Sequence, residues 1–250
     1  MKIALITGGS RGLGRNMAHH LAARGVDILF TYRSAKAEAD SLVAELAQIG
    51  RKAVALPLDT SVVAGFPAFA GKVAEALKAN WGRDRFDFLV NNAGTALYAP
   101  FAETTEAQLD GVINVHFKGV FMLSQAMLPL INDGGAILNL SSGLARFSYP
   151  GSSAYAAMKG AIDVLTRYMA LELGPRRIRV NAIAPGAIET DFGGGHVRDD
   201  AELNARIAGS TPLGRVGLPD DIGGVVSLLL SDEAYWLNGQ RVEVAGGIHA

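Results

Sequence analysis

The sequence predicts an α/β fold: a single doubly wound domain with a seven-stranded parallel sheet and helices on both faces. Short apolar runs alternate with longer segments of helical periodicity along all 250 residues, which is the pattern of strand–helix–strand units. Most runs are apolar on both faces, as expected for strands that helices cover on each side. The chain shows no linker and no internal repeat, so we expect residues 1–250 to form one domain.

The elements follow one another in a regular order. The first apolar run leads into a glycine-rich turn, the third is closed by Asp59, and the fifth precedes Ser142. Amphipathic stretches of helical length separate the runs. We expect strands at residues 3–7, 27–31, 53–58, 86–90, 136–140, 179–183 and 240–244, and helices at residues 12–24, 35–49, 62–79, 105–131, 153–173 and 219–230.

Residues 187–212 form a connection that is too long for an ordinary loop in a compact domain. The segment contains three consecutive glycines and follows the carboxyl end of the sixth strand. Ligands bind at the carboxyl ends of strands in open parallel sheets. We therefore expect residues 187–212 to be a mobile lid over a substrate site; the alternative is a surface excursion with no part in the site.

Composition excludes several classes of function. The formal net charge is −1, so no long-range attraction to nucleic acid or to an anionic membrane is expected. The chain has no cysteine and its five histidines lack metal-ligand spacing, which argues against disulfides and a metal site. No apolar run approaches the roughly 18 residues of a membrane span, and the N-terminal run is too short for a signal peptide. A cytoplasmic enzyme is the expectation.

A glycine-rich turn follows the first strand. Gly8, Gly12 and Gly14 allow the backbone to turn tightly, so that a pyrophosphate can approach the N–H groups at the start of a helix. Glycines in this spacing also occur in plain strand-to-helix turns. Their position at the first strand–helix junction favours a dinucleotide site of the Rossmann type.

The end of the second strand favours NADP(H) over NAD(H). An acid there would bind the adenosine ribose hydroxyls and repel a 2′-phosphate, but the chain carries Arg33 and Ser34. Arg33 could bind the phosphate through its guanidinium fork, and Arg11 in the glycine turn could reach the same group. The alternative is that both arginines are merely solvated.

Tyr155 and Lys159 share one face of a predicted helix, one turn apart. An ammonium beside a phenol favours the phenolate, so Lys159 is expected to lower the pKa of Tyr155 toward the range of general acid–base catalysis. This pair alone also occurs on ordinary helices. Together with Ser142, thirteen residues before Tyr155, and with the glycine turn, it indicates a nicotinamide-dependent oxidoreductase.

Over essentially its whole length, the chain resembles the short-chain dehydrogenase/reductase family, in the branch of about 250 residues that includes β-ketoacyl carrier-protein reductases and related ketone reductases. The resemblance rests on motifs in the family's order. Asn114, Ser142, Tyr155 and Lys159 match its catalytic tetrad. With the glycine turn and the second strand's end, the resemblance implies cofactor contacts at Gly8, Ser10, Arg11, Gly12, Leu13, Gly14, Arg33, Ser34, Asp59, Asn91, Ala93, Gly94, Tyr155, Lys159, Pro185, Gly186, Ile188 and Thr190.

The resemblance implies ketone–alcohol interconversion by hydride transfer. Tyr155 would be the general acid and base, and Ser142 would donate a hydrogen bond to the carbonyl oxygen. Lys159 would hold the nicotinamide ribose, and Asn114 would fix a water that connects Lys159 to solvent. The expected pocket residues suggest a mainly apolar substrate; they are residues 93–98, Leu144, Phe147, Tyr149 and the lid.

Three other functions compete with this reading. A carrier-protein-linked β-ketoacyl reductase of fatty-acid synthesis is weakened because no arginine precedes Glu172, although Arg146 and Arg167 lie nearby. A catalytically silent NADP(H)-binding protein would usually lack one residue of the tetrad. A methyltransferase, which also uses a glycine turn, would not require Ser142, Tyr155 and Lys159.

Two predicted helices indicate self-association. Residues 115–128 and 154–173 are apolar on several faces, whereas one sheet covers one side of a helix. In the family, these helices pair with their copies across a two-fold axis, and the C-terminal strand region makes a second contact. We expect a homotetramer, or a homodimer, whose pairing holds the helix of Tyr155 rigid; the alternative is that loops cover the second faces.

Overall fold

A computed structural model describes residues 1–249 and confirms the predicted sheet. Its seven strands pair in parallel in the order β3-β2-β1-β4-β5-β6-β7. The order reverses between β1 and β4, which in doubly wound sheets opens a crevice at the carboxyl ends of the strands. The strands are β1 (Lys2–Ile6), β2 (Val26–Tyr32), β3 (Ala53–Pro57), β4 (Phe86–Asn91), β5 (Ile131–Leu140), β6 (Arg179–Pro185) and β7 (Arg241–Val244).

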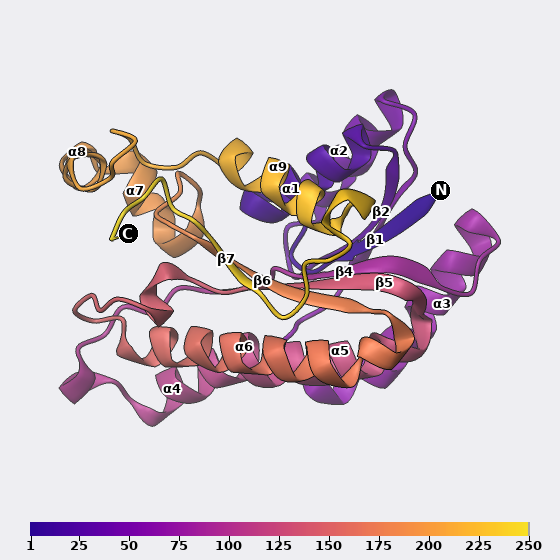
Figure 1. Cartoon of the computed structure of the whole chain (residues 1–250), viewed down its shortest axis with the longest axis horizontal. Helices are drawn as coiled ribbons and strands as arrows, with labels where there is room; N and C mark the ends of the chain where they lie inside the picture. Colours follow the sequence, from indigo (N-terminus) through magenta and orange to yellow (C-terminus); the bar gives the residue numbers. More distant parts are fainter. Residues whose placement is uncertain (250) are drawn as a thin grey trace.

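Helices cover both faces of this sheet, and Figure 1 shows the two layers, with α1 and α9 on one side and α5 and α6 on the other. Each strand-to-strand crossover therefore carries its helix to one face, as in other parallel sheets. The α-helices among the described residues are α1 (Gly12–Ala23), α2 (Lys36–Gln48), α3 (Phe66–Trp81), α4 (Glu106–Ile113), α5 (Gly119–Met127), α6 (Ser153–Glu172), α7 (His196–Asp199), α8 (Ala201–Gly209) and α9 (Pro219–Leu230).

Two apolar cores hold the layers together. Helices α1, α2 and α9 pack on one face, where Met17, Leu42 and Val226 are fully buried. Helices α3 and α5 pack on the other face, where Val73 and Met127 are equally inaccessible. Alternate residues of the central strands supply the two cores, since successive side chains of a strand point to opposite faces. The buried runs predicted from the sequence are thus the strands themselves.

The predicted helix over residues 105–131 is wrong at its centre and at its end. Helix α4 begins with a capping box in which the Thr105 hydroxyl accepts from the Gln108 N–H, and it ends at Ile113. A π-helical turn, Asn114–Lys118, follows before α5 begins. Strand β5 already starts at Ile131, because Ile131 pairs with Phe86 ahead of an irregularity in the β4–β5 register. Because this segment is uniformly apolar, its sequence pattern indicates neither the π-helical turn nor the start of β5.

The connection after β6 is folded, not a structureless loop. Residues 187–212 contain a 3-10 turn at Phe192–Gly195 and the helices α7 and α8. A short bridge between Ile188 and Gly217 ties its start to the chain before α9. In Figure 1, α7 and α8 project beyond one end of the sheet. The expectation that this segment is a lid stays a prediction.

Candidate active site

The glycine turn between β1 and α1 requires glycine at two positions for steric reasons. Gly8 has a φ of +64°, and a Cβ there would lie 3.1 Å from the Ala93 Cα. A Cβ on Gly14 would lie 2.2 Å from the Gly8 carbonyl oxygen, closer than atoms can approach. No side chain at these two positions therefore covers the backbone N–H groups at the N-terminus of α1. Such a terminus presents N–H groups to an anion, so the observed backbone fits a pyrophosphate.

The other predicted residues of the turn lie around it. Ser10 is buried and its carbonyl accepts from Arg15, while Leu13 packs against the core beneath α1. Gly12 has a φ of +55°, and Arg11 is exposed.

The turn is fixed to the loop after β4 by Thr7. Its hydroxyl accepts from the N–H groups of Asn92, at 2.9 Å, and Ala93, at 3.0 Å. The Asn92 side chain donates in return to the carbonyls of Thr7 and Gly8. These contacts bring Ala93 and Gly94 to the cleft. A Cβ on Gly94 would lie 2.8 Å from the His116 ring.

Asn91 lies next to this loop, but its side chain points into the protein. It is 4% exposed and donates to the Ser124 hydroxyl and to the Asn139 side chain, each at 2.9 Å. Asn139 in turn donates to Thr166 on α6. The side chain of Asn91 therefore connects the sheet to α5 and α6. Because this side chain is already engaged, the cofactor contact predicted for Asn91 would have to come from its backbone.

The ends of β2 and β3 lie together beyond the glycine turn. Arg33 and Ser34 are exposed, and no acid follows β2 directly. Asp59 lies in the loop after β3, where its carboxylate accepts from the N–H and hydroxyl of Ser61. Those hydrogen bonds, with the charge of Arg33, hold the pKa of Asp59 below its usual range. A carboxylate and an arginine thus flank the position expected for an adenosine.

The segment after β6 closes the opposite side of the cleft. Pro185 ends the strand, and a Cβ on Gly186 would lie 3.0 Å from the Ala245 Cα. Beyond Ile188, Thr190 is buried and its hydroxyl accepts from the Phe192 N–H. A Cβ on Gly12 would lie 3.8 Å from the Thr190 Cβ. The predicted cofactor residues of the glycine turn and those of the segment after β6 therefore face each other.

Ser142, Tyr155 and Lys159 meet beyond the carboxyl end of β5. The Ser142 hydroxyl accepts from the Leu144 N–H at 3.2 Å, which fixes the short turn after β5. Tyr155 and Lys159 lie on α6, with the Lys159 Nζ 5.4 Å from the centre of the tyrosine ring. Lys159 is buried, and its Nζ donates to the Leu140 carbonyl at 2.6 Å. The three side chains predicted to act together are therefore neighbours.

The expected lowering of the tyrosine pKa is wrong for this structure. Burial and the nearby Tyr98 raise the pKa of Tyr155 well above its ordinary value, and the Ser142 hydroxyl only counteracts this. Burial also lowers the pKa of Lys159 to about 8, against the opposing charge of Asp163. Desolvation dominates because Lys159 is buried and Tyr155 is largely surrounded by protein atoms. The Lys159 ammonium is also engaged with Leu140.

The ring of His116 lies against the ring of Tyr155. The two rings meet edge to face with their centres 5.1 Å apart. Side chains two residues apart on a helix do not face the same way, and within residues 1–249 no hydrogen bond joins the Asn114 side chain to Ser142, Tyr155 or Lys159. The role predicted for Asn114, which is to fix a water between Lys159 and solvent, stays a prediction. The π-helical turn begins at Asn114, and such turns are frequent at functional sites.

His116 is buried and neutral. Its Nε2 lies 2.7 Å from the Thr95 carbonyl oxygen and 3.2 Å from the Thr95 backbone nitrogen, so the ring is held by the backbone of Thr95. Nδ1 is buried without a hydrogen-bond partner among the described residues. Burial and the charge of Lys159 lower the pKa of His116 to about 3. The sequence signal for it was a single histidine inside an otherwise apolar helix.

Aromatic side chains surround the tyrosine on its open side. Phe192, from the segment after β6, lies with its ring centre 6.1 Å from that of Tyr155. A Cβ on Gly193 would lie 3.3 Å from Tyr98, so the segment contacts the loop after β4. Tyr98 and Tyr149 remain largely exposed. Flat apolar surfaces thus border the position where a substrate would meet Tyr155.

No helix among residues 1–249 is long and apolar enough to cross a membrane. In the same residues, no group of three histidine, aspartate or glutamate side chains is gathered around a position for a metal ion.

Comparisons with known proteins agree with this geometry. A family model described as enoyl-(acyl carrier protein) reductase matches residues 8–249. An uncharacterised oxidoreductase of Methylorubrum extorquens is 38% identical over 99% of this chain and 97% of its own length. A tetrahydroxynaphthalene reductase of Pestalotiopsis fici is 37% identical over 98% of this chain and 91% of its own.

Solved structures are equally similar. A short-chain dehydrogenase/reductase of Serratia marcescens superposes with a TM-score of 0.91 at 31% identity, covering 100% of this chain and 98% of that one. An angucycline C-6 ketoreductase with bound NADP gives 0.93 at 30% identity, covering 99% and 95%.

Proposed function

The chain belongs to the short-chain dehydrogenase/reductase family, and from that premise we propose that it is an NADP(H)-dependent oxidoreductase that interconverts a ketone and a secondary alcohol. The observation that carries the proposal is the meeting of Ser142, Tyr155 and Lys159 beside a glycine turn that fits a pyrophosphate. These side chains come from two different elements, the turn after β5 and helix α6. Their convergence has no evident structural purpose.

Each residue has a chemical role in this proposal. When bound, the nicotinamide supplies the hydride to the carbonyl carbon. Tyr155 donates the proton to the carbonyl oxygen, and Ser142 donates a hydrogen bond to the same atom as charge develops there. Lys159 holds the nicotinamide ribose. The raised pKa of Tyr155 keeps the phenol protonated at neutral pH, which suits the reductive direction.

NADP(H) is proposed because the end of β2 offers a cation and no acid. Arg33 is exposed beside Asp59, and Arg11 is exposed in the glycine turn. A guanidinium pairs with a 2′-phosphate through two parallel hydrogen bonds. The angucycline ketoreductase with bound NADP supports the same choice.

The substrate is proposed to be a bulky, flat ketone. Phe192 lies against Tyr155, Tyr98 lies near it, and Tyr149 lies near Tyr98, and aromatic faces stack on planar ligands. Relatives named for hydroxynaphthalene and angucycline reduction point to fused-ring ketones. Residues 187–212, which carry Phe192, are proposed to close over this substrate as a lid.

The test is a coupled assay in which the absorbance of reduced nicotinamide is followed with a panel of ketones. We expect turnover of fused-ring ketones with NADPH and little with NADH. Tyr155→Phe serves as the matched control, since any turnover that it retains is not due to the proposed proton donor. Binding of NADPH without oxidation of it by any ketone would instead indicate a silent binding protein.

A carrier-protein substrate is the second candidate, favoured by the description of the matching family model. Its support in the chain is weak, because Arg146 is already paired with Glu243. β-Ketoacyl and enoyl thioesters of an acyl carrier protein therefore belong in the same panel. Faster turnover of either thioester than of the free ketones would replace the proposed substrate class.

The enzyme is also proposed to act as a homotetramer or homodimer, with α5 and α6 at the interface. Large apolar side chains on these helices remain exposed in the single chain, among them Phe121, Val164, Tyr168 and Leu171.

A further inference from the structure

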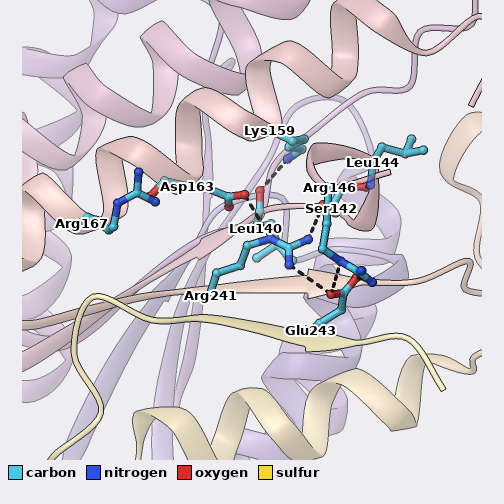
Figure 2. Close-up of polar contacts among 9 residues, drawn as sticks. All are labelled: Leu140, Ser142, Leu144, Arg146, Lys159, Asp163, Arg167, Arg241 and Glu243. Atoms are coloured by element: carbon cyan, nitrogen blue, oxygen red, sulfur yellow. Dashed lines mark hydrogen bonds and ion pairs between the residues drawn. The ribbon is translucent and has the colours of Figure 1, made fainter. Parts of the chain in front are cut away.

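Alternating charges extend from the catalytic lysine to strand β7, on the side of the site away from the proposed substrate. Figure 2 shows Lys159 and Asp163 on α6, Arg241 and Glu243 on β7, and Arg146 after β5 in one continuous group. Nothing in the proposed chemistry uses the last four. Arg146 is exposed, but the side chains of Asp163, Arg241 and Glu243 are largely withdrawn from solvent, where charges are costly unless they are paired.

Asp163 connects this group to Lys159. It follows Lys159 by four residues on α6, so both side chains share one face of the helix. The Asp163 side chain is 13% exposed, and its Oδ2 lies 3.1 Å from the Arg241 Nε in an ion pair. The Asp163 Oδ1 and the Arg241 Nε are both buried without a hydrogen-bond partner among the described residues, so charge alone holds the two side chains together. The ion pair with Arg241 neutralises the Asp163 carboxylate only in part. The remaining negative charge raises the pKa of Lys159.

Arg241 connects the same group to Ser142. Its Nη2 donates to the Ser142 carbonyl at 2.8 Å, and its Nη1 donates to Glu243 at 3.2 Å. Glu243 also accepts from Arg146 at 3.0 Å. One guanidinium thus contacts α6, the turn after β5 and β7. Its planar fork makes several directed hydrogen bonds at once, which a lysine could not do.

We propose that Asp163 and Arg241 are a positioning pair: Arg241 fixes the Ser142 backbone, and the charge of Asp163 keeps the Lys159 ammonium protonated inside the protein. The proposal rests on the function proposed above, because it assigns a purpose to Lys159 and Ser142. It adds two residues that touch neither substrate nor cofactor and that act only through their neighbours.

The direction of the effect follows from the charges around the pair. Lys159 is faced by Tyr155 and Asp163 on its own helix and by His116 from the π-helical turn. Burial raises the pKa of Asp163, and this is opposed by the Ser141 hydroxyl and by the charges of Arg241 on β7, Arg167 on α6 and Lys159. The Asp163 charge raises the pKa of Lys159, whereas burial lowers it. Arg241 has the opposite effect on the pKa of Lys159, because its positive charge partly neutralises the Asp163 carboxylate.

Opposite substitutions in the pair should therefore shift the pH profile in opposite directions. In Asp163→Asn, Lys159 loses its proton at lower pH, so the alkaline limb of kcat for ketone reduction should move down by about one pH unit. In Arg241→Met, no guanidinium neutralises Asp163, so the pKa of Lys159 should rise and the alkaline limb of kcat should move to higher pH. Arg241→Lys keeps the charge and should leave the limb in place, although the loss of the hydrogen bond to Ser142 should lower kcat.

A matched control exists elsewhere in the chain. Lys36 and Asp40 on α2 have the same spacing as Lys159 and Asp163, and they form an exposed ion pair at 2.6 Å. Asp40→Asn makes the same chemical change far from the site, so its pH profile should be that of the wild type. A loss of stability common to aspartate variants would appear in this control as well.

A second measurement is independent of turnover. Proteins labelled with 13C at the lysine ε-carbon report the titration of Lys159 directly by NMR, and Lys159→Met identifies its signal. Its apparent pKa should fall in Asp163→Asn and rise in Arg241→Met. Unchanged or parallel shifts in both variants would overturn the pair. If no ketone is reduced, the function proposed above fails, while this titration still decides the inference. If Arg241→Met does not fold, Arg241→Gln takes its place.

Discussion

At the scale of single residues, the site combines two groups whose charged forms are disfavoured. Burial raises the pKa of Tyr155 and lowers that of Lys159, so both the phenol and the neutral amine gain from the apolar surroundings. A tyrosine that stays protonated is suited to give its proton to a ketone. A lysine near its titration point is sensitive to single charges nearby, which is why Asp163 and Arg241 have consequences for it.

Replacing Tyr155 with Phe removes the phenol proton and preserves the ring. Turnover should fall by about 10²- to 10⁴-fold, the usual contribution of a general acid, whereas NADPH should still bind because the glycine turn is unaltered. Steady-state kinetics and a fluorescence titration with NADPH measure the two effects separately. A variant with nearly normal kcat would show that another group donates the proton.

His116 should make the protein sensitive to acid. Its pKa is lowered from 6.5 to about 3, so the unfolded chain binds a proton that the folded chain does not. Its share of the stability is therefore intact above pH 6.5 and is lost as pH falls below it, by roughly 1.4 kcal/mol per unit. His116→Gln retains a donor for the Thr95 carbonyl but cannot titrate. Urea unfolding at several pH values should show a weaker acid dependence in this variant; equal slopes would contradict the assignment.

The sequence predicts Tyr155 and Lys159 because their spacing follows ordinary helical geometry, and Ser142 because it follows a strand-like apolar run. It does not reveal His116, because the helix there changes from α to π at Asn114. Such a change alters which side chains face inward without altering the composition. The pKa of Tyr155 was also out of reach, since it depends on burial, which a spacing cannot give.

At the scale of elements, the strand-to-helix junctions carry the cofactor site. The Gly8–Gly14 turn was predictable because two backbone segments that touch each other leave no room for a side chain, so only glycine fits there. A Cβ on Gly14 would meet the Gly8 carbonyl oxygen at 2.2 Å. The extent of the helix over residues 105–131 was not predictable, because its apolar residues suit a helix, a π-helical turn and a buried strand equally well.

Gly14→Ala should therefore distort the start of α1. We expect a loss of several kcal/mol of stability, typical of overpacking against backbone, and weaker NADPH binding. Gly71→Ala is the matched control, because Gly71 lies within α3 and a Cβ there meets nothing within 4 Å. The control should gain up to about 1 kcal/mol from helix propensity. Thermal unfolding with and without NADPH measures both, and equal behaviour of the variants would refute the steric argument.

The end of β2 should determine the choice of cofactor. Arg33→Ala removes the exposed guanidinium beside Asp59, so Kd for NADPH should rise at least tenfold, by the loss of a charge-assisted pair. NADH lacks the 2′-phosphate, and its Kd should hardly change. Isothermal titration with both nucleotides gives the two values. A preference of the wild-type protein for NADH would show that this reading of β2 is wrong.

At the scale of the whole molecule, the sheet and its two helical layers leave apolar surface uncovered. The sheet buries one side of α5 and α6, yet Tyr168 is 60% and Leu171 75% exposed. Tyr235 and Trp236, before β7, are also exposed. Apolar patches of this kind in a chain without a membrane-crossing helix among its described residues are typical of interfaces between subunits.

Light scattering at micromolar concentration tests the assembly proposed for α5 and α6. One chain has a mass of 26.2 kDa, and we expect about four times that value, or twice it if only the helices pair. Leu171→Glu places a charge in the proposed interface and should reduce the mass. Ile49→Glu, an exposed position after α2, should not. Since α6 carries Tyr155 and Lys159, dissociation should also lower kcat. A wild-type mass of one chain would mean that these faces meet solvent and that the site is complete in a monomer.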